Sequence, residues 1–193
     1  MQTPLFHGTS TKPAQFEKAP PAVGGEGFAW SATRCLGIFF SECPRIAAHF
    51  ALRPEVVDAG YDTPQGSALL RKDPWRLSPD PFQPAAEVLT CRLPDEVRLF
   101  PVPLLEWIDL CETRDATFWL TWRRELQARG FEGLRVEGWD GESEHPEFGP
   151  PCVEYHAPTV VCFDARAVRI VDRAPAAAAW GVPSPPRPRL SMP

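Results

Sequence analysis

Two short stretches near the start of the chain combine a histidine–glycine turn with a block of aromatic rings. His7-Gly8-Thr9 ends a short apolar stretch, and Phe39 and Phe50 follow further along the chain. An imidazole can hydrogen-bond a hydroxyl group, and a glycine lets a ligand approach the backbone because it has no Cβ. A flat aromatic ring can stack on a planar leaving group. These residue types suit cleavage of a bond between a sugar and a flat heterocycle, a reaction that passes through an oxocarbenium-like sugar.

Each of these residues also has a structural interpretation. His7 follows Leu5-Phe6 and fits a hydrogen-bonded histidine at the end of a strand. Phe39 and Phe50 stand at strand and helix spacing, where aromatic residues belong to a core far more often than to a ligand site. Phe40 is expected in the core under either interpretation. The pairing of His7 with the aromatic block favours the functional one, because each short motif alone is a weak signal.

The elements that must position these residues alternate with long proline-rich connections. Residues 12–34 and 53–86 are interrupted by Pro and Gly and are expected to be irregular. The apolar segments between them predict strands at 4–10, 37–40, 87–93, 97–100, 133–136 and 159–164, the last continuing through 167–171. Strands of this kind with few helices predict an α+β fold.

Two helices are expected. The first begins between Ser41 and Pro44, a residue suited to a first helical turn, and its spacing is expected to present Phe50 on the side of the strand. The second spans 114–129, where Phe118, Trp122 and Leu126 recur every four residues. For this second helix, Asp115 is the expected N-cap and Gly130 the expected stop.

Composition predicts one domain that is no general nucleic-acid binder. The chain has 193 residues, of which 44% are hydrophobic, and a net charge of −5. Residues 1–173 are expected to form the domain, and 174–193 a flexible Ala/Pro-rich tail. The six cysteines are scattered without a Cys-x-x-Cys pair, which predicts free buried thiols and a reducing compartment. No stretch has the length of a signal peptide core or of a membrane span, so we expect no membrane partner.

Five motifs together resemble the ADP-ribosyltransferase superfamily of the diphtheria-toxin and poly(ADP-ribose) polymerase type. His7-Gly8-Thr9 is similar to its His-Gly-Ser/Thr strand end, and Gly37-Ile38-Phe39-Phe40-Ser41 to its Gly-Ile-Tyr-Phe strand. Phe50 stands where the family has a second tyrosine. Residues 130–136 resemble its Gly-Tyr-Asp-Gly-Ile step, and 160–171 its closing strand. The likeness thus covers about residues 4–172, closest in style to small bacterial or phage members.

The resemblance implies a split, largely antiparallel sheet with flanking helices, the ADP-ribosyltransferase fold. It also implies that NAD is the substrate. In the family, the histidine at His7 contacts ribose and the glycine at Gly8, followed by Thr9, grips the nicotinamide amide through its backbone. Phe39 and Phe50 would then frame the nicotinamide ring, with phenylalanine in place of tyrosine. The loss of the phenol removes a hydrogen bond but keeps the ring face that stacking uses.

The chain departs from the family at two positions. The catalytic glutamate of the family lies five residues before the aspartate of the closing strand, and counting back from Asp164 leads to Thr159. Glu154 is the nearest carboxylate that could replace it, while Thr159 would line the site without acting as an acid or base. The family's nicotinamide-binding serine, three residues before the stacking ring, is Ala47 here. Members without the glutamate transfer a single ADP-ribose or are inactive.

The resemblance therefore implies a mono-ADP-ribosyltransferase that acts on NAD and on an acceptor macromolecule, with protein favoured over nucleic acid. The alternatives are an NAD glycohydrolase and a catalytically inactive module that binds NAD or ADP-ribose. Glu142, Glu144, His145 and Glu147 have metal-ligand chemistry, but their spacing fits no standard site, so a solvated loop is expected.

The Ala-, Pro- and Arg-rich composition is compatible with a bacterial effector, toxin or phage-borne enzyme. Such a protein would act in the cytoplasm, or would be delivered into a target cell without an N-terminal signal peptide.

Overall fold

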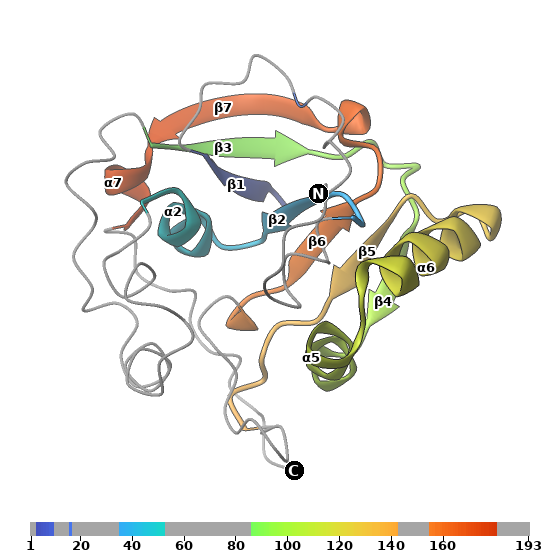
Figure 1. Cartoon of the computed structure of the whole chain (residues 1–193). Helices are drawn as coiled ribbons and strands as arrows, with labels where there is room; N and C mark the ends of the chain where they lie inside the picture. The colour runs from blue at the N-terminus through green and yellow to red at the C-terminus, as the bar shows by residue number, and fades with distance from the viewer. Residues whose placement is uncertain (1–2, 10–15, 17–34, 53–85, 143–154, 181–193) are drawn as a thin grey trace, which may run out of the picture.

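The structure is a computed structural model, and it describes residues 3–9, 16, 35–52, 86–142 and 155–180. Its centre is one sheet of seven strands in the order β4-β5-β6-β2-β1-β3-β7. Every neighbouring pair is antiparallel except β4 and β5, which are parallel. Figure 1 shows α2 and α7 beside one half of the sheet and α5 and α6 beside the other. The prediction of an α+β fold with a largely antiparallel sheet and flanking helices is confirmed.

The strands follow the apolar segments of the sequence closely. The first half of the chain contributes β1 (Leu5–Thr9) and β2 (Ile38–Ser41), and β3 (Glu87–Arg92) and β4 (Leu99–Val102) follow. The remaining strands are β5 (Gly133–Val136), β6 (Thr159–Cys162) and β7 (Arg169–Pro175). A short 3-10 turn, η3 (Ala165–Ala167), separates β6 from β7, so the predicted continuous strand is broken there.

The sheet has two faces, a helix face covered by the helices and an opposite face. The helix face carries Phe6, Phe39 and Val161, and these side chains pack in clusters with residues of α2 and α5. The opposite face carries Phe40 and Val160, which pack with Phe16. Because successive side chains of a strand point to alternate faces, this division assigns every strand residue to one face.

The helix α2 (Pro44–Leu52) begins where the sequence indicated. The Ser41 hydroxyl accepts a hydrogen bond from the Cys43 backbone N–H at 3.1 Å, and Pro44 follows as the first helical residue, where its missing N–H costs nothing. The face turned to β1 carries Ala47 and Ala51, not Phe50. The expectation that Phe50 faces the strand is therefore wrong, because small residues are needed where the helix backbone lies against the sheet.

The second half of the helix face is covered by α5 (Leu104–Thr113) and α6 (Ala116–Ala128). Both end signals predicted for α6 are confirmed: the Asp115 carboxylate accepts from the Phe118 N–H at 2.9 Å, and Gly130 has a φ of 81°. Helix α5 was not predicted from the sequence. Its buried residues recur at helical spacing and could have revealed it: Leu104, Trp107, Ile108 and Cys111.

The domain extends further than composition suggested. The strand β7 runs to Pro175, and α7 (Ala176–Trp180) follows it, with Ala176 and Ala179 buried in the cluster under α2. A tail beginning at residue 174 is therefore wrong for 174–180, because these alanines fill the narrow space beside the alanine-rich face of α2. Residues 181–193 lie outside the described part of the chain.

Two further predictions can be compared with the fold. All five described cysteines are buried and outside disulfides, as the scattered spacing indicated, and Cys152 lies outside the described residues. In the described part of the chain, every helix is too short or too polar to cross a bilayer.

Candidate functional site

The most specific polar contact of the candidate site joins β1 to β2 through a side chain. The Nδ1 atom of His7 lies 2.8 Å from the backbone carbonyl oxygen of Phe39. A carbonyl can only accept, so Nδ1 carries the hydrogen and donates it. Burial lowers the pKa of His7, although the hydrogen bond to Phe39 opposes this shift in part. The imidazole is therefore neutral near pH 7, with Nε2 as a hydrogen-bond acceptor.

The His7–Phe39 hydrogen bond lies where the pairing of β1 with β2 ends. β1 and β2 are paired in register only at Phe6 and Ser41, whereas β1 pairs with β3 along its full length. Beyond that single pair, the Phe39 carbonyl accepts from the His7 side chain. The backbone ladder between β1 and β2 thus ends after one residue pair, and the imidazole spans the opening.

The His7 ring itself belongs to the opposite face. It lies edge-on to Phe16, with ring centroids 5.1 Å apart, and 5.6 Å from Phe40. Phe16 and Phe40 also meet edge-to-face. Phe40 is 2% exposed, so its expected place in the core is confirmed. These rings fix the orientation of the imidazole and supply the desolvation that lowers its pKa.

Phe39 and Thr159 lie on the helix face. Phe39 is half-buried, and its ring centroid is 6.3 Å from that of Trp107 on α5. Thr159 is the first residue of β6, is half-buried and pairs with Ser41 of β2. Because Phe39 is two residues from Ser41, Phe39 and Thr159 are diagonal neighbours on the same face of an antiparallel pair.

Gly8 is the point at which α2 sits on β1. A Cβ atom added there would lie 1.8 Å from the Ala47 carbonyl oxygen and 3.0 Å from the Ala51 nitrogen. No side chain fits at that distance, so the helix backbone can reach the strand only because residue 8 is glycine. Ala47 is 2% exposed as a result. The strand β1 ends at Thr9, which pairs with Glu87 at the start of β3.

Phe50 is the exposed residue of a largely buried helix. Its side chain is 52% exposed, whereas the neighbouring His49 is fully buried. The two rings meet edge-to-face at 5.6 Å. Burial alone lowers the pKa of His49 to about 4. An exposed benzyl ring on a helix that contacts Gly8 is available to a ligand.

The three predicted ring positions do not form one closed clamp. His7 contacts Phe16 and Phe40, Phe39 contacts Trp107, and Phe50 contacts His49. Within the described residues no ring contact joins these three sets. The resemblance implies that His7 binds the ribose beside a nicotinamide ring framed by Phe39 and Phe50. The three rings do not meet in this way, because strand alternation places the side chains of residues 7 and 39 on opposite faces. What joins His7 to Phe39 is the carbonyl group of the latter.

The carboxylates of the site are only partly described. Glu154, the candidate replacement for the family glutamate, lies outside the described residues. Sequence reasoning did not select Glu42, whose backbone N–H donates to the Pro158 carbonyl next to Thr159. Its carboxylate accepts two hydrogen bonds from Arg135, at 2.8 and 3.2 Å. This bidentate pairing occupies both oxygens of Glu42 and balances its charge.

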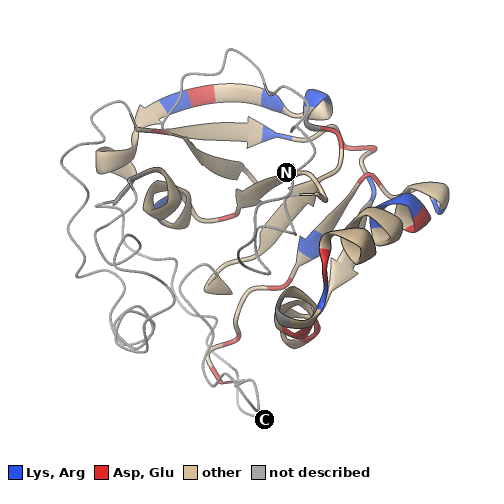
Figure 2. Cartoon of the chain, in the orientation of Figure 1, with Lys and Arg blue, Asp and Glu red and all other residues tan. Residues whose placement is uncertain are grey.

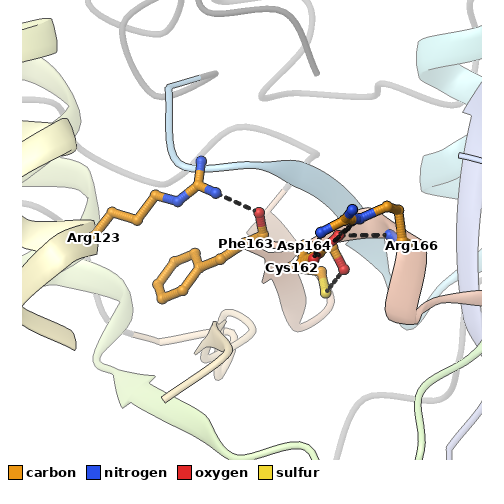
Figure 3. A network of polar contacts seen from close by, with 5 residues as sticks. All are labelled: Arg123, Cys162, Phe163, Asp164 and Arg166. Carbon is orange, nitrogen blue, oxygen red and sulfur yellow. Dashed lines mark hydrogen bonds and ion pairs between the residues drawn. The ribbon is translucent and has the colours of Figure 1, made fainter. Parts of the chain in front are cut away.

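Arg123 on α6 donates hydrogen bonds to backbone carbonyls next to β2 and β6. Arg123 donates to the Phe163 carbonyl at 2.7 Å and to the Cys35 carbonyl at 3.2 Å. Cys35 precedes β2 and Phe163 follows β6, so one guanidinium is bonded near an end of each strand. Figure 3 shows the bond to Phe163. The adjacent Asp164 is bound by Arg166 at 2.6 Å. These contacts keep β2 and β6, and with them Phe39 and Thr159, at a fixed spacing.

Metal chemistry finds no support in the described residues, where no group of three or more His, Cys, Asp or Glu side chains could hold an ion. Of the acidic loop, only Glu142 is described, and its backbone N–H donates to the Asp140 carboxylate.

A scan against protein-family models, a search of curated proteins and a search of solved structures each gave no match. The family resemblance therefore rests on the motif residues of this chain.

Proposed function

We propose that the chain is a mono-ADP-ribosyltransferase that cleaves NAD at nicotinamide and transfers ADP-ribose to a macromolecular acceptor. The single observation that carries the proposal is the hydrogen bond from His7 Nδ1 to the Phe39 carbonyl at the divided edge of β1 and β2. It fixes the tautomer, so that the second ring nitrogen can accept a hydrogen bond from a ribose hydroxyl. No partner of that nitrogen is found among the described residues.

The neighbouring residues supply the other parts of such a site. Gly8 packs against the backbone of α2 on one side. Its other edge lies where the ladder between β1 and β2 has ended, and the carboxamide would bond to the β1 backbone there. Phe50 offers an exposed ring on the same helix, and Phe39 a half-buried one on β2. Either ring suits stacking on nicotinamide from the side of the sheet that the helices cover. His7 packs on the opposite face, so the proposal requires NAD to reach its ribose contact through the opening between β1 and β2.

An oxocarbenium-like sugar requires negative charge beside it, and the described residues named above supply no unpaired carboxylate for this role. Thr159 carries no charge, and the Glu42 carboxylate is paired with Arg135. The proposal therefore assigns this role to Glu154 or to a group of the acceptor, which suits transfer of a single ADP-ribose. Free thiols accord with a reducing compartment. We propose that the protein works in the cytoplasm of its own cell or of a target cell.

The neutral Thr159 also favours a second function, an inactive module that binds NAD or ADP-ribose without turnover. The two are separated by incubating the full chain with radiolabelled NAD and a cell extract, and by measuring released nicotinamide and labelled macromolecule. The transferase predicts both products. Saturable NAD binding with neither product would establish the inactive module, and free ADP-ribose without labelled acceptor would indicate a glycohydrolase.

The decisive variant is His7→Asn. The asparagine amide can still donate to the Phe39 carbonyl, so the opening between β1 and β2 is kept, but the acceptor at the Nε2 position is lost. Nicotinamide release is expected to fall about a hundredfold, the usual size of losing one such contact in a transition state. Thr121→Ala, an exposed position on α6, is the control and is expected to leave the rate unchanged. Labelling that survives His7→Asn at the original rate contradicts the proposal.

A further inference from the structure

A row of aromatic rings crosses α6 and β4, far from the proposed NAD site in the order of the sheet. Phe118 stacks on Trp122 at 5.9 Å, Trp122 meets Phe100 at 6.3 Å, and Phe100 meets Phe131 at 5.2 Å. All four rings are half-buried, so each keeps part of its surface in contact with solvent. We call this set, with the arginines below, the aromatic–arginine row.

Three exposed arginines lie over the two ends of the row. Arg114 lies 5.3 Å from the centre of Phe118 at one end. At the other end, Arg98 lies 4.8 Å from the centre of Phe131, and Arg129 lies 5.5 Å from the same ring and 5.3 Å from Phe100. Two like charges are thus drawn to a single ring, which attracts each of them through its quadrupole.

None of these three guanidinium groups forms an ion pair with a carboxylate in the described part of the chain. The ion pairs found there involve Arg135, Arg166 and Arg173 instead. Figure 2 shows both charge signs along α6, and within the described residues no ion pair joins its acidic side chains to the three arginines. The donor forks of Arg98, Arg114 and Arg129 therefore remain open, held in place by the rings rather than by anions. A pre-organised guanidinium of this kind binds a carboxylate with two parallel hydrogen bonds.

We propose that the aromatic–arginine row is a docking surface for an acidic protein segment, one in which two groups of Asp or Glu residues flank apolar side chains. The cationic ends of the row would pair with the acidic groups, and the exposed ring edges between them would contact the apolar residues. Arg and aromatic residues are the types that dominate binding energy at protein interfaces. A polynucleotide fits less well, because its phosphates are evenly spaced, whereas within the described residues no cation lies over Trp122 between the two arginine-bearing ends.

Addition of a strand to the sheet is not the binding mode. β4 is the edge strand beside the row, and it contains Pro101, which has no N–H to donate. The contact must therefore be made by side chains, and it does not depend on NAD.

The test uses the full chain and fluorescein-labelled synthetic peptides, read by fluorescence anisotropy. One peptide has two acidic clusters separated by four apolar residues, and its partner has Asn and Gln in place of Asp and Glu. Saturable binding is expected for the acidic peptide, about tenfold tighter than for the neutral one, and weaker when salt is raised to about 0.15 M and beyond. A single-stranded oligonucleotide is the competing probe.

The variant Arg98→Gln/Arg129→Gln is expected to weaken binding of the acidic peptide about tenfold. The variant Arg98→Lys/Arg129→Lys keeps the charge but loses the two-pronged guanidinium geometry. Its affinity for the acidic peptide is expected to lie between that of the glutamine variant and that of the parent chain. The matched control is Arg92→Gln/Arg169→Gln, two exposed arginines of β3 and β7 with no ion pair within the described residues. It removes the same charge at the opposite end of the sheet and should change affinity less than about twofold. Thermal melting confirms that each variant is folded.

Three results overturn the proposal: no saturable binding of the acidic peptide, equal losses in the row variant and the control, or tighter binding of the oligonucleotide through the same arginines. The last result would replace the protein segment with a nucleic acid as the occupant. Each of them leaves the NAD proposal unaffected, because nicotinamide release is measured without the peptide.

Discussion

The fully buried His49 makes the stability of this protein depend on pH between about 4 and 6.5. Its pKa falls from 6.5 to about 4 because burial on α2 disfavours the charged imidazole. In the unfolded chain the side chain takes up a proton near pH 6.5, so the unfolded state binds more protons in this interval. The stabilising contribution is therefore complete above pH 6.5 and is lost as the pH falls toward 4.

The magnitude follows from the same two pKa values. The full interval corresponds to about 3 kcal/mol in the free energy of unfolding, of which about 2 kcal/mol is lost between pH 7 and pH 5. His7, whose pKa is also lowered by burial, adds a contribution of the same sign. The parent chain should thus lose stability steeply on mild acidification.

The assay is urea denaturation of the parent chain and of His49→Gln at about pH 7 and about pH 5. The variant removes the titrating group and should lose about 2 kcal/mol less than the parent between the two conditions, whatever its stability at pH 7. Because the chain has four histidines, an NMR titration can follow His49 directly. An ordinary pKa near 6.5 for this residue, or an unchanged pH dependence in the variant, would show that buried His49 does not cause the pH dependence of stability.

Three further predictions concern the contacts that hold the site together. Gly8→Ala should destabilise the fold by about 3 kcal/mol in denaturation experiments, because the new Cβ meets the Ala47 carbonyl oxygen at 1.8 Å; a loss below about 1 kcal/mol would mean that α2 yields easily. Arg123→Met should cost about 2 kcal/mol, since two backbone carbonyls lose their donor, and unchanged stability would show that water replaces the guanidinium. Asp115→Ala should cost about 1 kcal/mol by removing the cap of α6, and an unaltered melting temperature would contradict the assigned cap.

Local signals in the sequence were sufficient to predict an element's ends where a single residue caps or stops it. Asp115 and Gly130 gave both ends of α6 because capping and a left-handed φ depend only on nearby backbone atoms. The strand at 133–136 was also predicted correctly. By contrast, α5 was missed although its apolar spacing is helical. Its N-cap residue, Pro103, makes no side-chain capping hydrogen bond, so no capping residue marks its start.

The arrangement of the candidate site could be predicted only in part. Strand alternation already implied that Phe39 and Phe40 point to opposite faces, but which of them meets His7 depends on where the β1–β2 ladder ends, and that is a tertiary property. Similarly, the spacing of Ile46 and Phe50 marks a helix face without saying which face is buried. Gly8 determines which face of α2 is buried, because the helix approaches this glycine closely through the face that carries Ala47 and Ala51.

We propose that His7 presents a fixed acceptor nitrogen to the ribose of NAD. The most direct measurement is nicotinamide release from NAD by the parent chain and by folded His7→Asn under the same conditions. We predict release by the parent chain and a fall of about a hundredfold in the variant. Equal rates in the two proteins, or no release by the parent chain, would contradict the account.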